Sequence, residues 1–284
     1  MRSLNWGGTV DDRDLWAAVI AEFVGPFALV IAGVGAIIST QNLADGGNLV
    51  AVSLAHGLAI GLMVAALGHV SGGHFNPSVT ISMLATGQIA LTRAISYIIA
   101  QVLGATAGAG VLTLVFPALG PMGRNNPGVN LGLPGLGPEV SVSGALIMEA
   151  VMTFFLVMVI FGTVVDPRGP KAIAPLAIGL IITMDILTGG RITGAAMNPA
   201  RAIGPAIVQQ DFTNWWIYWV GPIIGGLVAA FAYTSIWLGG GRARLPARRK
   251  TSSVGSQTAP ATDTSVAETL PPAQPARRRS SRRR

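Results

Sequence analysis

The decapeptide SGGHFNPSVT at residues 71–80 is polar and rich in glycine, although the chain on either side of it is strongly apolar. A second decapeptide, TGAAMNPARA at residues 193–202, repeats its Asn-Pro pair. Asparagine is among the preferred N-cap residues and proline is preferred at the first helical position, so each pair predicts the start of a helix. About ten residues of apolar sequence follow each pair, or roughly 15 Å of helix, which is half the thickness of a bilayer core. Because irregular backbone at membrane depth is tolerated only inside protein or beside a wet cavity, we expect two re-entrant half-helices next to water.

The composition around these decapeptides is that of a membrane protein. The 284 residues are 51% hydrophobic and only 11% charged, whereas soluble domains average about 25% charged residues. A helix that crosses a bilayer needs about 20 apolar residues in a row. Six runs meet this requirement, at roughly 15–38, 49–70, 91–116, 141–165, 172–189 and 214–238. We therefore predict an all-α membrane protein with six transmembrane helices plus the two half-helices.

The first apolar run could be a cleaved signal peptide or a retained helix. It follows MRSLNWGGTVDDRDLW, which places three acidic residues just before the run. Signal peptides have a basic start and a short apolar core, so we interpret the run as a retained first span.

The two halves of the chain have the same layout. Each half-helix follows the second span of a three-span unit, and the units open with similar helices, AEFVGPFALV at 21–30 and MEAVMTFFLV at 148–157. Because three spans is an odd number, the second unit is inserted upside down relative to the first. We assign repeat one to 15–116 and repeat two to 141–240. The half-helices then enter from opposite faces, and their Asn-Pro starts meet near the midplane.

The positive charge of the chain is concentrated at its C-terminal end. Residues 242–284 hold eleven basic and two acidic residues, whereas residues 1–241 hold eight basic and ten acidic ones. Segment 241–284 lacks apolar periodicity and predicts disorder. We interpret it as a cytoplasmic basic tail that fixes topology or touches anionic lipid, in preference to a nucleic-acid-binding segment. With six spans, the N-terminal segment 1–14 is then cytoplasmic too, and we expect a multi-pass protein of the plasma membrane.

The meeting point of the half-helices has a definite chemistry. Each helix start carries roughly half a positive elementary charge from its dipole. The Asn side chains can accept hydrogen bonds from the backbone and present amide donors to the lumen. Water or another neutral polar molecule can replace its lost hydrogen bonds there, whereas a cation meets an unfavourable field and a proton wire is broken. These features predict a passive pore that excludes ions and protons.

Over about residues 15–240 the chain resembles the aquaporin family of major intrinsic proteins. The motifs that carry the resemblance are GHVSGGHFNPSVT and GAAMNPARAIGP in a duplicated six-span chain. One departure is visible, because the first signature is Asn-Pro-Ser where the family usually has Asn-Pro-Ala; a serine is still small enough for close contact of the half-helices. The two signatures are Asn76, Pro77 and Ser78, and Asn198, Pro199 and Ala200.

The resemblance implies roles for the residues around the signatures. Asn76 and Asn198 are expected to supply central donors, and Arg201 to mark the outer constriction and not a mere structural ion pair. Acceptor ladders are expected from the carbonyls of Gly72, Gly73, His74, Phe75, Gly194, Ala195, Ala196 and Met197.

Counting from the signatures places the other filter positions of the family on His56, Ile186 and Ala195. Strict water channels typically have a Phe at the first of these positions and a His at the second. This chain has His and Ile instead, which implies a wider constriction with one apolar wall. The set resembles that of plant tonoplast intrinsic proteins, which are associated with water, ammonia and often hydrogen peroxide. His56 is expected to line the pore in preference to packing as a structural histidine.

Three further residues are expected to support the pore. Glu22 and Glu149 occupy matching places in the repeats, and buried carboxylates need partners, so we expect them to accept from amides of the re-entrant loops. His69 is expected to hold a loop beside the first signature. Asp185, next to the filter, either pairs with Arg191 or faces a wet vestibule. The resemblance also implies a homotetramer with one pore per subunit.

The sequence fits three other functional classes less well. Glycerol facilitators usually carry an Asp after the filter arginine, a basic residue four positions later, and Pro with an aliphatic residue in the last span. This chain has Ala202, Ala206, Tyr218 and Trp219 there, as water channels do. An ion-coupled secondary transporter shares inverted repeats and broken helices, but would show saturable, ion-coupled flux. An enzyme is not expected, because the sequence has no cysteine, nucleophile–base pair, metal-spaced cluster or phosphate loop, and no cofactor is expected.

Overall fold

The six apolar runs form six long helices in the computed structural model, which describes residues 12–40, 48–116 and 131–239. The helices long and apolar enough to cross a membrane are Asp14–Thr40, Leu49–Ser71, Leu91–Val115, Val142–Val165, Lys171–Gly189 and Ile217–Ile236. The described ranges contain no strand, so the all-α, six-span prediction is confirmed. The expectations for the basic tail and for most of the N-terminal segment fall outside the described residues.

Some of these spans are built from more than one helical element. Span one consists of α1 (Asp12–Leu29), a π-helical turn η1 (Val30–Val34) and α2 (Gly35–Thr40). The remaining spans are α3 (Leu49–Ser71), α5 (Leu91–Val115), α6 (Val142–Ile160) with the π-helical turn η4 (Phe161–Val165), η5 (Lys171–Ile173) with α7 (Ala174–Gly189), and α9 (Ile217–Ile236).

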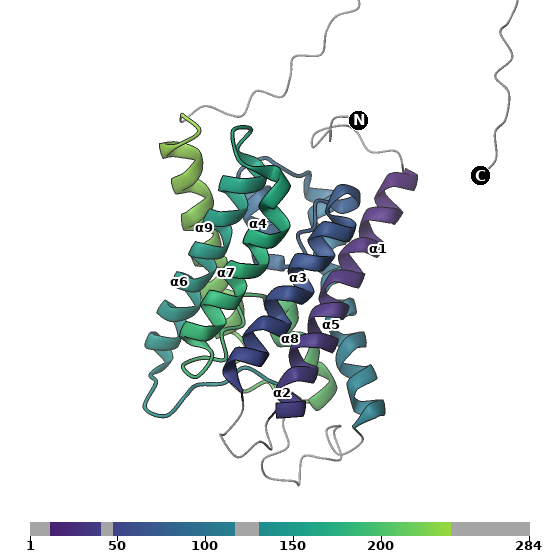
Figure 1. The fold of residues 1–284 in the computed structure, drawn as a ribbon, viewed down its shortest axis with the longest axis vertical. Coiled ribbons are helices and arrows are strands. Elements are labelled where there is room, and N and C mark those ends of the chain that lie inside the picture. Colours follow the sequence, from purple (N-terminus) through teal and green to yellow (C-terminus); the bar gives the residue numbers. More distant parts are fainter. Residues whose placement is uncertain (1–11, 41–47, 117–130, 240–284) are drawn as a thin grey trace, which may run out of the picture. The chain divides into compact units, whose positions relative to one another are not determined.

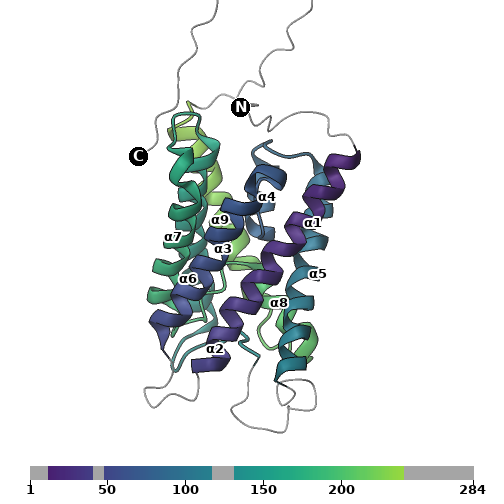
Figure 2. The ribbon, with the colours of Figure 1, turned by 45° about the vertical axis from the view of Figure 1, so that its right-hand side comes forward.

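The two Asn-Pro pairs start short helices, as predicted. They are α4 (Pro77–Ala85) and α8 (Pro199–Gln209). Asn76 and Asn198 are the N-caps, with extended backbone and side chains that accept from the first turn. Figure 1 and Figure 2 show α4 in the upper half of the bundle and α8 in the lower half. The half-helices therefore enter from opposite faces, which confirms the inverted repeat.

Small residues allow the spans to pack closely in matching pairs. α1 packs on α5 as α6 packs on α9, and α3 packs on α7 between the two repeats. At the α3–α7 crossing, a Cβ on Gly179 would lie 2.7 Å from the carbonyl oxygen of Gly57, which no side chain tolerates. At the α1–α5 crossing, a Cβ on Gly108 would lie 2.9 Å from the carbonyl oxygen of Phe27. In lipid, such close approach of helix backbones drives association.

The hinge between spans four and five is tied to the end of span six. Arg168 donates from Nε to Asp166 Oδ1 (2.9 Å) and from Nη2 to Asp166 Oδ2 (2.6 Å), and the same Nη2 donates to Trp237 O (2.8 Å). The Tyr233 hydroxyl also donates to Asp166 Oδ2, at 3.1 Å. The hydrogen bonds and charge of Arg168 hold the pKa of Asp166 well below its usual range.

Candidate functional site

The starts of the two half-helices touch through their asparagines. Asn76 Nδ2 donates to the carbonyl of Met197 at 2.9 Å, and Asn198 Nδ2 donates to the carbonyl of Phe75 at 2.9 Å. Each Oδ1 is occupied by a backbone amide of its own helix, for example Ser78 N at 2.8 Å from Asn76 Oδ1. Since each side-chain amide has two N–H groups, one remains after the cross-contact. Both asparagines line the central cavity, so these remaining donors lie beside its lumen.

The backbone before each asparagine turns in the same unusual way. Positive φ angles occur at equivalent positions of the two loops, at Gly72 (101°), Gly73 (63°), Phe75 (50°), Gly194 (84°), Ala195 (45°) and Met197 (50°). Side chains other than glycine adopt such angles at a cost, so the surrounding contacts must hold these loops in place.

Six of the eight carbonyls predicted to form ladders accept no hydrogen bond from the described residues, namely those of Gly72, Gly73, His74, Gly194, Ala195 and Ala196. The carbonyls of Phe75 and Met197 differ, because each accepts from the asparagine of the opposite loop. Gly73, His74, Ala195 and Ala196 line the cavity, whereas Gly72 and Gly194 are not among its lining residues.

One end of the cavity contains a buried arginine. Arg201 is 2% exposed, and its Nη1 donates to the carbonyl of Gly132 at 2.7 Å. Its Nη2 lies 3.4 Å from Nε2 of His56, whose Nδ1 lies 2.8 Å from the carbonyl of Val52. Because a carbonyl only accepts, we assign the imidazole hydrogen to Nδ1, which leaves Nε2 as an acceptor that faces Arg201. Ile186 and Ala195 line the same cavity, so the structure brings the four predicted filter residues together.

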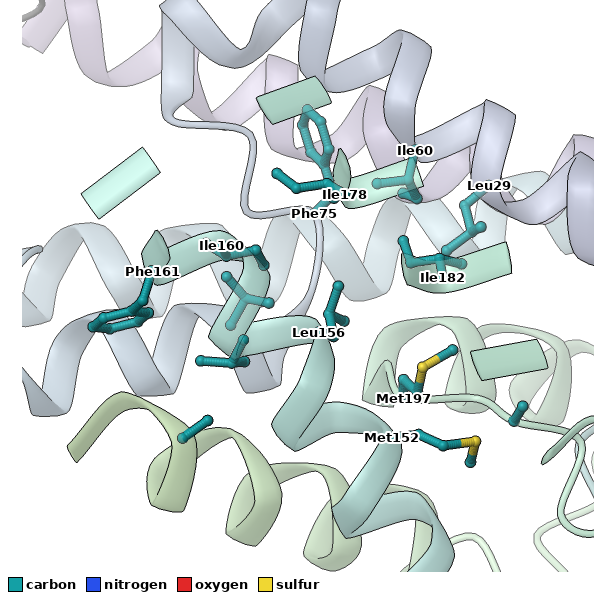
Figure 3. Packing of buried hydrophobic residues seen from close by; sticks show 14 of the residues in the cluster. Leu29, Ile60, Phe75, Met152, Leu156, Ile160, Phe161, Ile178, Ile182 and Met197 are labelled. Carbon is teal, nitrogen blue, oxygen red and sulfur yellow. The ribbon is translucent and has the colours of Figure 1, made fainter. Parts of the chain in front are cut away.

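The cavity is polar on one side and apolar on the other. The re-entrant loops, the two asparagines and Arg201 supply the polar groups. The spans supply an apolar lining of Leu29, Ile60, Leu156, Ile160, Ile178, Ile182 and Ile186. Figure 3 shows most of these side chains within one buried cluster. A solute in the cavity can form hydrogen bonds on one side only. Weak binding of this kind allows the solute to leave and pass through the channel.

Comparisons with known proteins agree with this geometry. The Major intrinsic protein family matches residues 9–233 of the chain. Aquaporin TIP4-4 of Zea mays is 43% identical over 236 residues, which cover 81% of this chain and 90% of that relative. The lens fiber major intrinsic protein of Lithobates pipiens is 45% identical over 222 residues, which cover 78% and 81%. The solved structure of the aquaglyceroporin from Plasmodium falciparum matches with a TM-score of 0.70 at 27% identity, covering 78% of this chain and 96% of that one.

This chain belongs to the major intrinsic protein family. As a major intrinsic protein it is an integral, multi-pass membrane channel that conducts passively, and it is not an enzyme.

In this major intrinsic protein, a buried glutamate holds the first re-entrant loop. Glu22 Oε1 accepts from the amide of His74 (2.9 Å) and from the Ser71 hydroxyl (2.7 Å). Glu22 Oε2 accepts from the amide of Phe75 (2.7 Å) and from Gln101 Nε2 (2.7 Å). All four groups donate hydrogen bonds to the carboxylate, so both of its buried oxygens have partners.

Glu149 holds the second loop in the same manner. Its Oε1 accepts from the amide of Ala196 (3.0 Å) and from the Thr193 hydroxyl (2.7 Å), and its Oε2 accepts from the amide of Met197 (2.8 Å). The network around Glu149 has no counterpart of Gln101, because the corresponding position, 222, is a proline.

Four further residues complete these networks in roles that were not predicted from the sequence. Ser71 and Thr193 each bond a glutamate and also accept from a loop amide two residues on. Tyr97 and Tyr218 donate to the carbonyls of Ser71 and Thr193, at 2.7 and 3.0 Å. A signal existed for the first pair, since a hydroxyl residue stands five positions before each signature asparagine.

The expectation for His69 does not agree with the structure. Its side chain is exposed on the last turn of α3 and forms no hydrogen bond with the described residues. Two residues correspond to about 200° of rotation around a helix, so Ser71, and not His69, faces the loop.

Asp185 also departs from expectation. It is buried, and its Oδ2 has no hydrogen-bond partner among the described residues. Arg191 is exposed, and within the described ranges the ion pair found is Asp166–Arg168.

The residues used to weigh the glycerol facilitators lie away from the cavity. Ala202, Ala206 and Tyr218 surround a separate hollow together with Pro134 and Trp215.

Proposed function

We propose that this protein is a water channel whose filter also passes ammonia and hydrogen peroxide, while ions and protons are excluded. The observation that carries the proposal is the filter of His56, Ile186, Ala195 and Arg201 around one cavity. An imidazole is smaller than a benzyl ring, and Ile186 adds no hydrogen-bond donor on its side. Ammonia, which is about the size of water, finds the Arg201 guanidinium and the loop carbonyls as partners.

Selection against charge is assigned to the middle of the cavity. In this proposal Asn76 and Asn198 supply the central donors, and the loop carbonyls supply acceptors on either side. Two helix starts direct positive potential at the same place, which disfavours cations. Glu22 and Glu149 act as structural acceptors and not as proton carriers, because all their contacts are donors that fix the loops.

The proposal is tested by the variant His56→Phe in proteoliposomes. Phenylalanine fills the space at Arg201 and narrows the filter, so ammonia permeability is expected to fall by a larger factor than water permeability. Stopped-flow measurements at matched protein content give both rates. Equal loss of the two permeabilities would show that His56 does not select between solutes.

Flux measurements on the same vesicles distinguish the water channel from the two alternative transport functions. A glycerol facilitator would pass glycerol as fast as water, and a secondary transporter would show saturation and dependence on an ion gradient. Ala202 and Ala206 stand where glycerol facilitators usually carry an Asp and a basic residue, which favours the water channel.

We further propose a homotetramer with one pore per subunit, in contact with lipid, in the plasma membrane with both termini cytoplasmic. The division into segment 1–14, channel domain 15–240 and basic tail 241–284 belongs to the same proposal. The basic tail and the positive-inside rule support the cytoplasmic termini, and the resemblance to aquaporins supports the tetramer. Native mass spectrometry in detergent tests the tetramer, and protease access to a C-terminal tag in intact cells and in fractionated membranes tests topology and location.

A further inference from the structure

The π-helical turn of span one lies against the filter. η1 covers Val30–Val34 between two α-helical segments, and its flanking residues Leu29 and Gly35 have ordinary helical dihedral angles. η1 packs on α3, the helix that carries His56. A single π-helical turn inside an α-helix is rare and is often found at functional sites. One residue of the turn reaches the filter.

That residue is Gly33, whose backbone contacts the imidazole of His56. A Cβ placed on Gly33 would lie 2.5 Å from Cδ2 and 2.6 Å from Cε1 of His56, and it would also clash with Nε2. These atoms form the edge of the ring that is directed at Arg201. Real Cβ atoms essentially never approach other heavy atoms within 3.0 Å. Any side chain at position 33 therefore requires the imidazole to move.

The imidazole has little freedom to do so without changing the filter. Its Nδ1 is held by the carbonyl of Val52 at 2.8 Å, and its Nε2 lies 3.4 Å from Nη2 of Arg201. The ring is almost completely buried and lines the cavity. Displacement away from Gly33 breaks the bond to Val52 or brings the ring toward the lumen.

We propose that Gly33 is a further specificity-determining position of the pore, acting as a positioning residue through His56. Its missing side chain lets the imidazole lie back against span one, and this depth sets the width of the passage beside Arg201. The proposal rests on the function proposed above, because it takes His56 as part of the filter. It adds span one to the elements that determine which solutes pass.

Gly35 offers a matched control two residues further along the same span. A Cβ on Gly35 would meet only Leu112 Cδ2, at 3.8 Å, which is ordinary van der Waals contact. Gly33→Ala and Gly35→Ala therefore make the same chemical change in the same helix. Only the first is expected to affect the filter.

The test measures water and ammonia permeability of both variants in proteoliposomes, in the native background and in His56→Ala. Gly33→Ala alone is expected to lower permeability per channel about tenfold, equivalent to about 1.4 kcal/mol of barrier. Gly35→Ala is expected to leave both rates unchanged. In the His56→Ala background, Gly33→Ala is expected to cause no further loss, because its methyl group enters the space that the ring has left. If Gly33→Ala alone gives too little folded protein to measure, the double variant with His56→Ala is expected to restore the folded yield.

The contrary outcomes are distinct. A Gly33→Ala effect of the same size in both backgrounds, no effect in the native background, or a folding defect that His56→Ala does not relieve overturns this proposal alone. No change in either permeability for His56→Ala by itself contradicts the filter assignment of the proposed function, and with it this proposal.

Discussion

Ser71, five positions before Asn76, and Ser78, in the first signature, are both buried, but their hydroxyl groups differ in their hydrogen-bond partners. Ser71 Oγ donates to Glu22 and accepts from the amide of Gly73, at 2.7 and 3.0 Å. Ser78 Oγ has no partner among the described residues. Removing a satisfied hydroxyl leaves its partners unpaired, whereas removing an unpartnered one relieves a desolvation cost. The departure from Asn-Pro-Ala at position 78 is therefore expected to add nothing to stability.

Ser71→Ala is expected to destabilise the protein by about 1–3 kcal/mol, the cost of unpaired buried groups. Ser78→Ala is expected to be neutral or stabilising. Thermal unfolding in detergent measures both variants, and Ser39→Ala, at an exposed hydroxyl, serves as a control. Equal destabilisation by the two substitutions at buried serines would contradict the hydrogen-bond assignment.

Several residues of the pore could be predicted from local sequence signals. The others are defined by contacts between residues distant in the chain, which the sequence does not reveal. An Asn-Pro pair specifies a helix start by itself, so the positions of Asn76 and Asn198 follow from the sequence. The contacts of Arg201 with Gly132 and of His56 with Gly33 join residues far apart in the chain. No periodicity or spacing marks such a contact before the fold is known.

The half-helices could be predicted from the sequence, whereas the π-helical turns could not. α4 and α8 end where their apolar segments end, because each is a short local pattern between clear start and stop signals. η1 and η4 leave the apolar runs unbroken, so no sequence signal predicts them. η4 leads directly into the hinge, where Asp166 and Arg168 join spans four and five to span six.

The hinge is expected to respond to acid. A carboxyl group whose pKa is lowered by folding contributes stability above its unfolded pKa of about 3.9, and this contribution is lost as pH falls toward the folded value. Asp166 has such a lowered pKa because of Arg168. Thermal midpoints of the native protein and Asp166→Asn are expected to differ by a constant amount from about pH 7 to pH 5, and to converge below about pH 4. A difference independent of pH over this range would contradict the pairing.

The whole molecule is an inverted repeat in which corresponding glutamates, hydroxyl residues and tyrosines hold corresponding loops. Its symmetry is broken at one end of the cavity, where His56 and Arg201 come from different repeats and meet. The repeat was recognisable from the order of spans and signatures. The pairing of α1 with α5 and of α6 with α9 required the structure, because apolar spans give no sign of which neighbour they choose.

The chain contains no cysteine. Mercurial reagents are therefore expected to leave water permeability unchanged, because no thiolate is available to bind them. Permeability of proteoliposomes before and after treatment checks this. Inhibition that a thiol reverses would be inconsistent with the sequence.

The channel itself is tested by stopped-flow light scattering on proteoliposomes that contain the native protein, with water, ammonia and glycerol compared against empty vesicles of the same lipid. Water and ammonia are expected to cross much faster than in empty vesicles, while glycerol crosses at nearly the empty-vesicle rate. Glycerol flux as fast as water, or no excess water flux at all, would contradict a water channel with the filter of His56, Ile186, Ala195 and Arg201.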